Sequence, residues 1–330
     1  MTRIALDAMG GDFAPETPIE GAVLALQSLP ASHDIVLVGR SADIETALSL
    51  HDVPEGRLRV VDAPDVIDMA EKPLQAIRGK RKSSIRIGLE MVKVGEADAF
   101  VSGGNTGAMM AGSTLVLGLH PGVDRPAIGA LFPTVSQPVL LLDAGANVDC
   151  TPRELRGFAR LGSVYARDVL QRPQPSVGLL NIGDEAEKGN EAVRGAHALL
   201  AEDPGLRFVG NVEGRDIING DCDVVVCDGF VGNVVLKFYE SVARLFGGLL
   251  EQEVSAELLQ TPGMQRVFKI LDYTEYGGAP LLGVRGVSII CHGSSPARAI
   301  ANAIAVAAQS VDSQVSQHIA AKMAEDGAVP

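Results

Sequence analysis

The sequence predicts an α/β protein with a mostly parallel sheet that carries helices on both faces, and three observations support this. Short apolar runs recur along the chain, each suited to a strand buried on both faces of a sheet, and each ends in a polar loop containing glycine. Segments with helical spacing lie between these runs. With 46% hydrophobic residues, a chain of 330 residues can bury a large core, as one large α/β unit or as two fused ones.

The stretch 99–113 contains a strand, a glycine loop and the start of a helix. Residues 99–101 are apolar, as expected for a short buried strand. Three glycines then let the backbone turn sharply and approach a ligand closely: Gly103, Gly104 and Gly107. Asn105 and Thr106 open the helix, with Thr106 expected as N-cap. A helix N-terminus attracts anions, so this segment fits a phosphate site and a plain strand-to-helix turn equally well.

Repetition favours the phosphate site. The same strand-and-loop pattern recurs at 3–12, 139–149, 177–183, 224–233 and 287–295. In open parallel sheets such loops gather outside the carboxyl ends of the strands, where ligands bind. The sequence therefore predicts one long cleft that many loops line.

The first half of the chain contains further elements in order. A capping box at Thr17-Pro-Ile-Glu20 predicts a helix through Leu29. A helix at 41–50 follows between strands at 35–39 and 58–61, and 62–71 is expected to be a loop. The densest basic cluster then precedes a helix that reaches about Val94: Arg78, Lys80, Arg81, Lys82 and Arg86. The residues alone favour a solvated helix start for this cluster.

A second capping box, Thr151 to Glu154, predicts a helix to about Leu170. The loop after the 177–183 segment places Lys188 just before a helix that ends near Glu202. This lysine is a candidate for neutralising a phosphate or an oxyanion, although a surface lysine among carboxylates is more often simply solvated. A strand at 207–211 follows.

Beyond Lys237 the alternation of strands and helices stops, and the apolar residues follow helical spacing to Leu271. The break at 261–263 predicts a helical hairpin, inserted at 238–271 into a single α/β catalytic domain that spans 1–330. A dimer seam is the simplest use of its apolar residues. After His292, Pro296 starts an alanine-rich helix.

Charge and motifs exclude several classes of function. A net charge of −13 argues against nonspecific nucleic-acid binding, and the N-terminus shows no apolar signal core. The four cysteines have neither metal-ligand nor redox spacing. The sequence lacks the usual nucleotide, zinc-protease and serine-hydrolase motifs. Cys291 and His292 are neighbours on a strand and point to opposite faces, so a thiol nucleophile is not expected; His292 could bind a ligand or brace its loop.

The chain closely resembles the PlsX family, the acyl-[acyl-carrier-protein]:phosphate acyltransferases of bacterial phospholipid synthesis, over nearly its whole length. The matching blocks are 5–12 with 14–15, 104–108, 142–143 with 145–149, 178–183, 188–191, 210–213, 228–230 with 232–234, 276–279 and 292–295. The departures are Phe13 where the family has histidine, Gly103 where it has alanine and Ala144 where it has valine. Phe13 puts any catalytic role of that histidine in doubt.

The resemblance implies a fold similar to isopropylmalate dehydrogenases and phosphate acetyltransferases, and transfer of a fatty acyl group from a carrier-protein thioester to inorganic phosphate. It implies neither a cofactor nor a metal. The resemblance implies that phosphate binds to Gly104, Asn105, Thr106, Gly107, Gly293, Ser294 and Ser295. It implies that the catalytic residues are Lys188, Asn233 and His292. The basic cluster would dock the carrier protein.

We further expect a cytoplasmic homodimer, which attaches reversibly to the membrane and supplies a membrane glycerol-3-phosphate acyltransferase. The hairpin tip around Leu258, Leu259 and Met264 is the expected membrane contact. Two other classes remain open: a same-fold enzyme, either a phosphate acetyltransferase or an NAD-dependent oxidoreductase, and a scaffold that binds the carrier protein without catalysis.

Overall fold

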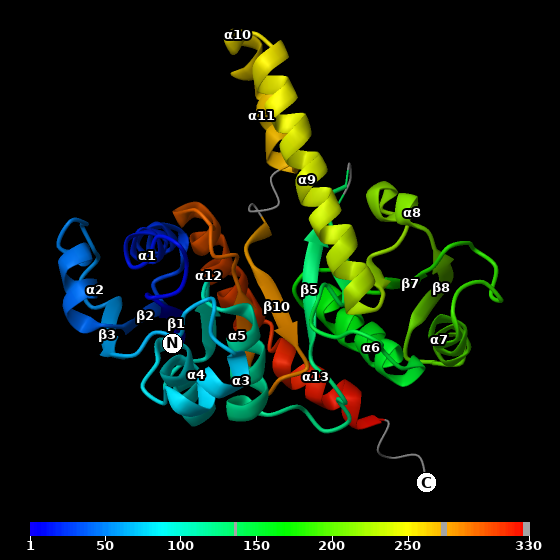
Figure 1. The fold of residues 1–330 in the computed structure, drawn as a ribbon, viewed down its shortest axis with the longest axis horizontal. Helices are drawn as coiled ribbons and strands as arrows, with labels where there is room; N and C mark the ends of the chain where they lie inside the picture. The colour runs from blue at the N-terminus through cyan, green and yellow to red at the C-terminus, as the bar shows by residue number, and fades with distance from the viewer. Residues whose placement is uncertain (135–136, 272–275, 326–330) are drawn as a thin grey trace. The chain divides into compact units, whose positions relative to one another are not determined.

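A computed structural model describes residues 1–134, 137–271 and 276–325. The chain forms two compact units. Unit 1 comprises Met1–Pro126 and Tyr276–Pro330, and unit 2 comprises Ala127–Glu275. Each unit has a mostly parallel sheet with helices packed on it, which confirms the predicted fold class (Figure 1).

The sheet of unit 1 has the strand order β3-β2-β1-β4-β11-β10, in which only β10 runs antiparallel to its neighbour. The strands are β1 (Thr2–Asp7), β2 (His33–Gly39), β3 (Leu58–Asp62), β4 (Ala99–Ser102), β10 (Ala279–Leu282) and β11 (Val287–Ile290). Helices α1 (Glu16–Ser28) and α12 (Ala297–Asp312) pack together on one side, and α4 (Ser84–Val94) packs on the other (Figure 1). The remaining helical segments are α2 (Ser41–Leu48), α3 (Pro73–Gly79), α5 (Thr106–Gly112), the π-helical turn η1 (Ser113–Leu117) and α13 (Val315–Ala324).

The sheet of unit 2 has the order β5-β6-β9-β7-β8, in which only β5 is antiparallel to its neighbour. The strands are β5 (Ala127–Phe132), β6 (Val139–Leu142), β7 (Ser176–Leu180), β8 (Arg207–Val212) and β9 (Val224–Val226). The helices are α6 (Pro152–Asp168), α7 (Glu191–Ala201), α8 (Gly214–Asn219), α9 (Gly229–Glu253), α10 (Ala256–Leu259) and α11 (Pro262–Leu271). In both units the parallel strands therefore end at one edge, which collects the loops that follow them.

The capping boxes predicted at the starts of two helices have different outcomes. At α6 the box is confirmed, because the Thr151 hydroxyl accepts from the Glu154 N–H and the Glu154 carboxylate accepts from the Thr151 N–H at 2.8 Å. At α1 the prediction is wrong, because the helix begins one residue before Thr17 and its N-cap, Pro15, has no side-chain hydrogen bond. Tertiary packing, including the contact of α1 with α12, holds that helix instead.

The hairpin begins earlier than its sequence pattern indicates. The segment at 229–233, expected as a glycine loop, forms the first turns of α9 because the Asp228 carboxylate accepts from the Phe230 N–H at 2.8 Å and caps the helix. Helix α11 returns along α9, and α10 lies at the far end from the strands of unit 2 (Figure 1). No described helix combines the length and hydropathy needed to cross a membrane.

Candidate active site

The two loops predicted to bind phosphate lie side by side in unit 1, because β4 and β11 are parallel neighbours. The loop that follows β1 joins them. The Asp12 N–H donates to the Gly293 carbonyl at 2.8 Å, and the Cys291 N–H donates to the Ser102 carbonyl at 2.8 Å. A Cβ atom added at Gly103 would lie 3.3 Å from the Gly10 carbonyl oxygen, so these backbones approach closely.

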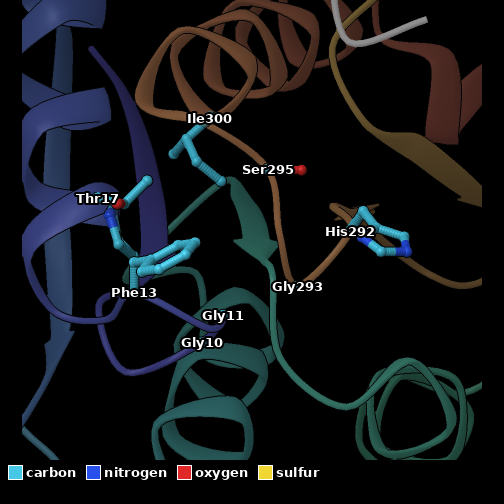
Figure 2. A pocket seen from close by; sticks show the side chains of 9 residues that line it. Gly10, Gly11, Phe13, Thr17, His292, Gly293, Ser295 and Ile300 are labelled. Carbon is cyan, nitrogen blue, oxygen red and sulfur yellow. The ribbon is translucent and has the colours of Figure 1, made fainter. Parts of the chain in front are cut away.

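A pocket opens between the loop after β1 and the loop after β11 (Figure 2). Its lining residues are Gly10, Gly11, Phe13, Thr17, Pro18, His292, Gly293, Ser295 and Ile300. Phe13 lies on its wall with 64% of the residue exposed. The pocket therefore presents an apolar ring at the position where the resemblance predicts a histidine.

Asn105, rather than Thr106, is the N-cap of α5, which corrects the sequence expectation by one residue. Its amide oxygen accepts from the Ala108 N–H at 3.0 Å. Its amide nitrogen donates to the carbonyls of Asp68, Met69 and Glu71 at 3.1 to 3.3 Å. Because both ends of the amide have partners within the protein, the Asn105 side chain is not available to bind an anion directly.

Two free donors near the Gly104 loop lie in the first turn of α5. The Gly104 N–H is already used, because it donates to the Ser102 hydroxyl at 3.0 Å. Among the described residues, no group accepts from the N–H of Thr106 or Gly107. Thr106 is exposed, so these two N–H groups and its hydroxyl can reach a ligand.

His292 is exposed and braces its own loop. Its Nδ1 lies 2.8 Å from the Ser294 hydroxyl and accepts from the Ser294 N–H at 3.3 Å. Because a backbone N–H can only donate, a neutral His292 ring carries its proton on Nε2. That N–H points away from Phe13 with the rest of the ring (Figure 2) and can donate to a ligand while Nδ1 holds the loop.

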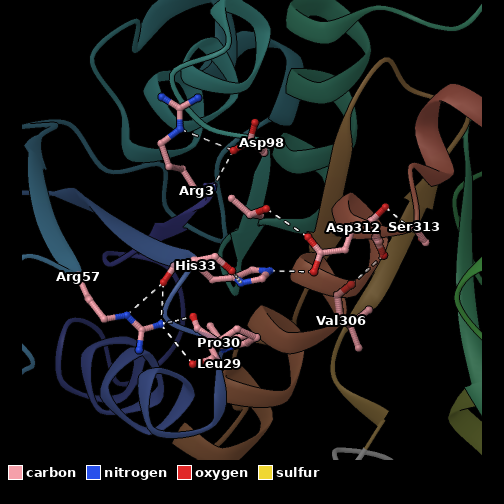
Figure 3. A network of polar contacts seen from close by, with 12 residues as sticks. Arg3, Leu29, Pro30, His33, Arg57, Asp98, Val306, Asp312 and Ser313 are labelled. Carbon is pink, nitrogen blue, oxygen red and sulfur yellow. Dashed lines mark hydrogen bonds and ion pairs between the residues drawn. The ribbon is translucent and has the colours of Figure 1, made fainter.

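The helix that follows this loop, α12, is anchored at its other end by a polar network (Figure 3). The His33 Nε2 lies 2.8 Å from the Asp312 carboxylate at the C-terminus of α12. The Arg57 guanidinium donates to the carbonyls of Leu26, Leu29, Pro30 and His33. These contacts fix α1, β2 and α12 relative to one another and so support the start of α12.

In unit 2, Asn233 lies in the first turns of α9 beside the loop that follows β6. A Cβ atom added at Gly145 would lie 3.3 Å from the Asn233 Cβ. Asp228 joins the two segments, because its carboxylate accepts from the Cys150 N–H at 2.9 Å as well as from the Phe230 N–H. The amide of Asn233 is exposed and can act as a neutral donor.

Lys188 lies in the loop between β7 and α7, and its side chain is exposed. The backbone of the loop is ordered by Asn181, whose amide donates to the Lys188 carbonyl at 3.1 Å. None of the described carboxylates forms an ion pair with the Lys188 ammonium. Since β7 pairs with β9, the Lys188 loop and the Asn233 turn both lie at the carboxyl edge of the same sheet.

The basic cluster spans the end of α3, the turn at 80–82 and the start of α4, and fewer of its charges are free than the sequence suggests. Lys80 forms an ion pair with Glu71 and donates to the Val66 carbonyl at 2.7 Å, and its hydrogen bond lowers the pKa of Glu71. Arg86 pairs with Glu90 at 2.6 Å. Arg78, Arg81 and Lys82 are exposed and have no ion pair among the described residues. We call these three residues the basic patch.

Sequence reasoning missed two buried carboxylates under the loops, Asp7 and Asp143. Burial raises the pKa of both, although each accepts several hydrogen bonds. The signal was present, because Leu-Asp-Ala occurs at the end of two predicted strands, at 6–8 and 142–144. Burial also raises the pKa of the Cys291 thiol to about 12, which makes it a poor nucleophile, as the sequence predicts.

Comparison with known proteins identifies the family. A family model described as fatty acid synthesis protein matches residues 2–318. A phosphate acyltransferase of Desulforamulus reducens is 51% identical over 319 residues, which cover 94% of each chain. A phosphate acyltransferase of Synechococcus sp. (strain JA-3-3Ab) is 49% identical over 98% of this chain and 90% of the relative.

Solved structures of phosphotransacetylases share the fold. The enzyme from Streptococcus pyogenes matches with a TM-score of 0.62 and 18% identity, and EutD from Staphylococcus aureus with 0.60 and 13%. Each match covers 94% of both chains. The chain thus belongs to the fatty acid synthesis protein family, as its resemblance to PlsX proteins indicates, and is an acyltransferase.

Proposed function

We propose that the protein transfers a fatty acyl group from the thioester of an acyl carrier protein to inorganic phosphate, and that the acyl phosphate formed feeds phosphatidic acid synthesis. The observation that carries this proposal is the pairing of the Gly104 and His292 loops in unit 1, which offers backbone N–H and hydroxyl donors suited to an anion. The names of the relatives support phosphate as the acceptor.

The proposed reaction needs neither a strong base nor a covalent intermediate. A phosphate oxygen attacks the thioester carbonyl carbon, a carbon–oxygen bond forms, and the carbonyl electrons move onto oxygen. The carbon–sulfur bond then breaks, and the carrier leaves as a thiolate that takes a proton from solvent. Phosphate is already largely dianionic near neutral pH, so positioning and oxyanion stabilisation supply the catalysis.

Each side chain has a proposed role. Thr106, Gly107 and the loop at 293–295 hold phosphate, and His292 donates through Nε2. Lys188 neutralises charge on phosphate or the tetrahedral oxyanion, and Asn233 donates to that oxyanion. Loss of one oxyanion donor typically lowers turnover about a hundredfold.

The decisive experiment is a thiol-release assay with an acyl carrier protein, with and without phosphate. Acyl transfer requires release that depends on phosphate, and Lys188→Ala and Asn233→Ala should each lower turnover about a hundredfold. Arg194→Ala provides a control, because Arg194 donates to the Gly189 carbonyl in the same region. Binding of the carrier without thiol release would indicate a scaffold, and near-normal turnover of Lys188→Ala would remove its assignment.

The hairpin formed by α9, α10 and α11 supports a further part of the proposal, assembly and membrane contact. Exposed apolar side chains follow α9, and no residue of α10 or α11 is buried. We propose that the middle of α9 forms a homodimer seam and that the tip, with Leu258, Leu259 and Met264, touches the inner face of the membrane. A cytoplasmic enzyme could then pass its amphiphilic product to a membrane glycerol-3-phosphate acyltransferase.

A further inference from the structure

Two buried carboxylates lie directly beneath the loops that carry the proposed site. Asp7 ends β1 in unit 1 and Asp143 follows β6 in unit 2, with exposed fractions of 1% and 0%. None of the described lysines and arginines forms an ion pair with either carboxylate. A carboxylate buried without a cation is costly unless hydrogen bonds compensate it, so the donors indicate what each carboxylate orders.

Asp7 connects the loops after β1 and β4. One oxygen accepts from the Met9 N–H at 3.0 Å, and the other accepts from the Ser102 hydroxyl at 2.7 Å. The Ser102 oxygen in turn accepts from the Gly104 N–H. A Cβ atom at Gly10 would lie 2.5 Å from the Asp7 carboxylate and 2.7 Å from the Gly104 nitrogen. The Gly104 loop is thus held by a series of hydrogen bonds that runs from the Gly104 N–H through Ser102 to Asp7.

Asp143 orders the loop that contacts Asn233. One oxygen accepts from the N–H groups of Ile128 and Ala146 at 2.9 and 3.1 Å. The other accepts from the backbone and the side chain of Asn147 at 2.7 and 2.9 Å. Cβ atoms added at Gly229 and Gly232 of α9 would lie 2.6 Å from this carboxylate and 1.9 Å from the Asp143 carbonyl oxygen. The first turn of α9 therefore packs directly against Asp143.

We propose that Asp7 and Asp143 are positioning residues of the same kind in the two units. Asp7 acts through Ser102 on the phosphate loop, and Asp143 acts through its own loop on Asn233. This inference rests on the proposed function. It assigns separate effects: Asp7 sets the affinity for phosphate, and Asp143 sets the stabilisation of the oxyanion and hence turnover.

In the structure both carboxylates act as hydrogen-bond acceptors. In the Asp7 chain the Ser102 oxygen accepts from the Gly104 N–H, while the Ser102 hydroxyl donates to Asp7. An asparagine at position 7 presents one NH₂ group, which would face either the Ser102 proton or the Met9 N–H. At position 143 both oxygens accept two donors, so an NH₂ group would meet an N–H on either side. Asp143→Asn therefore places an NH₂ group against N–H donors, and Asp7→Asn removes one acceptor from its network, so that the Ser102 hydroxyl or the Met9 N–H must find another partner, with almost no change in volume.

The chain offers a matched control. Asp223 accepts from the Ser176 N–H and hydroxyl, both at 2.8 Å, an aspartate–serine pair like that of Asp7 and Ser102. Ser176 begins β7, and Asp223 directly precedes β9, so this pair lies at the amino ends of the strands, away from the proposed site. Unlike Asp7, Asp223 also forms an ion pair with Arg172 at 3.5 Å. Asp223→Asn therefore removes an aspartate–serine network without touching a substrate loop.

The experiment measures kcat, the KM for phosphate and the melting temperature of each variant in the thiol-release assay. Asp7→Asn and the milder Ser102→Ala should raise the KM about tenfold, the equivalent of one hydrogen bond to a charged group, with a smaller change in kcat. Asp143→Asn and the milder Asn147→Ala should lower kcat about tenfold with a smaller change in KM. Asp223→Asn should lower the melting temperature and change neither kinetic constant more than about twofold.

Amide hydrogen exchange keeps the test independent of activity. Asp7→Asn and Ser102→Ala should speed exchange at 103–107, and Asp223→Asn should not. If a stable, folded Ser102→Ala variant keeps both the wild-type exchange and the wild-type KM, the role of Asp7 is overturned, and an unchanged kcat in Asn147→Ala and Asp143→Asn overturns that of Asp143. A wild-type protein that releases no thiol with phosphate would refute the proposed function, and the exchange data would still test how the loop is held.

Discussion

At the residue scale, Asn105 combines two structural tasks in one amide. Its oxygen caps α5, while its nitrogen binds three carbonyls of the 68–71 loop. Because neither end is free, its effect on phosphate should be indirect. The same holds for Gly104, whose N–H donates to Ser102. Some residues of the predicted phosphate loop therefore hold the loop in its conformation and do not contact phosphate themselves.

Asn105→Ala removes the cap and the loop contacts together. We expect the free energy of unfolding to fall by about 1–2 kcal/mol and the KM for phosphate to rise. Asn105→Asp keeps the cap oxygen but loses the donors, so it should recover part of the stability while the KM stays high. Chemical denaturation and the thiol-release assay measure these changes. An unchanged KM in both variants would separate this residue from phosphate binding.

The buried ion pair of Arg160 and Asp203 gives a prediction about pH. Its atoms are 2.6 Å apart, and the Asp203 side chain has 0% exposure. Burial by itself raises the pKa of Asp203, but hydrogen bonds from Arg160 and the Gly205 N–H outweigh it, so the pKa lies below its usual 3.8. A lowered pKa in the folded state stabilises the protein above pH 3.8, and this contribution is lost as the pH falls through the folded value.

Asp203→Asn should therefore lower the free energy of unfolding at pH 7 by about 1–3 kcal/mol, because it removes the carboxylate that accepts a hydrogen bond from the buried Arg160 guanidinium. The difference from wild type should shrink as the pH falls below 3.8. Urea denaturation at a series of pH values measures it. A difference that stays constant down to the lowest pH would contradict the assignment.

At the element scale, α6 begins with the capping box formed by Thr151 and Glu154. Thr151→Ala should lower the free energy of unfolding by about 1 kcal/mol, since an orphan N–H at the start of the helix loses its acceptor. Thr46→Ala is a matched control, because its hydroxyl only donates back to the Ala42 carbonyl within α2. Equal effects of both substitutions in denaturant titrations would show that the box is not what stabilises α6.

The middle of α9 is the proposed dimer seam, and it carries exposed apolar side chains such as Phe238 at 70% and Leu245 at 60%. Phe238→Glu with Leu245→Glu should convert a dimer into a monomer, because each charge would be buried at the seam. Size-exclusion chromatography with light scattering reads out the mass. If the wild-type protein is already a monomer, the proposed dimer seam is wrong.

The hairpin tip makes a separable prediction. Leu258→Glu with Leu259→Glu should abolish flotation with liposomes while the dimer persists. Because Glu251, Glu253 and Glu257 are exposed near the tip, wild-type attachment should be weak and reversible. The seam variant serves as the control for the tip variant. Flotation that the tip variant leaves unchanged would place the membrane contact elsewhere or exclude it.

At the scale of the whole molecule, an acidic protein with a net charge of −13 must attract an acidic carrier protein through a local surface. The basic patch of Arg78, Arg81 and Lys82 is our candidate, since Lys80 and Arg86 are held by internal carboxylates. An interface of this kind acts mainly on the association rate and weakens with salt.

Arg81→Glu with Lys82→Glu should raise the apparent KM for the acyl carrier protein at low salt, and high salt should reduce the difference. Arg59→Glu with Lys93→Glu makes the same change in net charge at exposed positions outside the patch, and it should have a much smaller effect. Steady-state kinetics at two ionic strengths compare the two variants. Equal effects would mean that only net charge matters, and the patch would be abandoned.

The sequence by itself determined the fold class, most of the parallel strands and most of the loops that follow them. Apolar runs that end in glycine loops specify buried parallel strands and their carboxyl ends, and this information is local. The Thr151 box was predicted for the same reason, since a cap depends on residues three apart. Family blocks around Gly104, Lys188, Asn233 and His292 indicated the acyltransferase chemistry.

Only the tertiary structure decided which polar groups are free and which already have a hydrogen-bond or ion-pair partner within the protein. Lys80 and Lys82 look alike in sequence, but a carboxylate nine residues before Lys80 pairs with it. Asp7 meets Ser102 across 95 residues, and that contact uses the Gly104 N–H that the sequence offered to phosphate. Local patterns cannot specify such partners, because a hydrogen bond forms between groups that the fold brings together, whatever their separation along the chain.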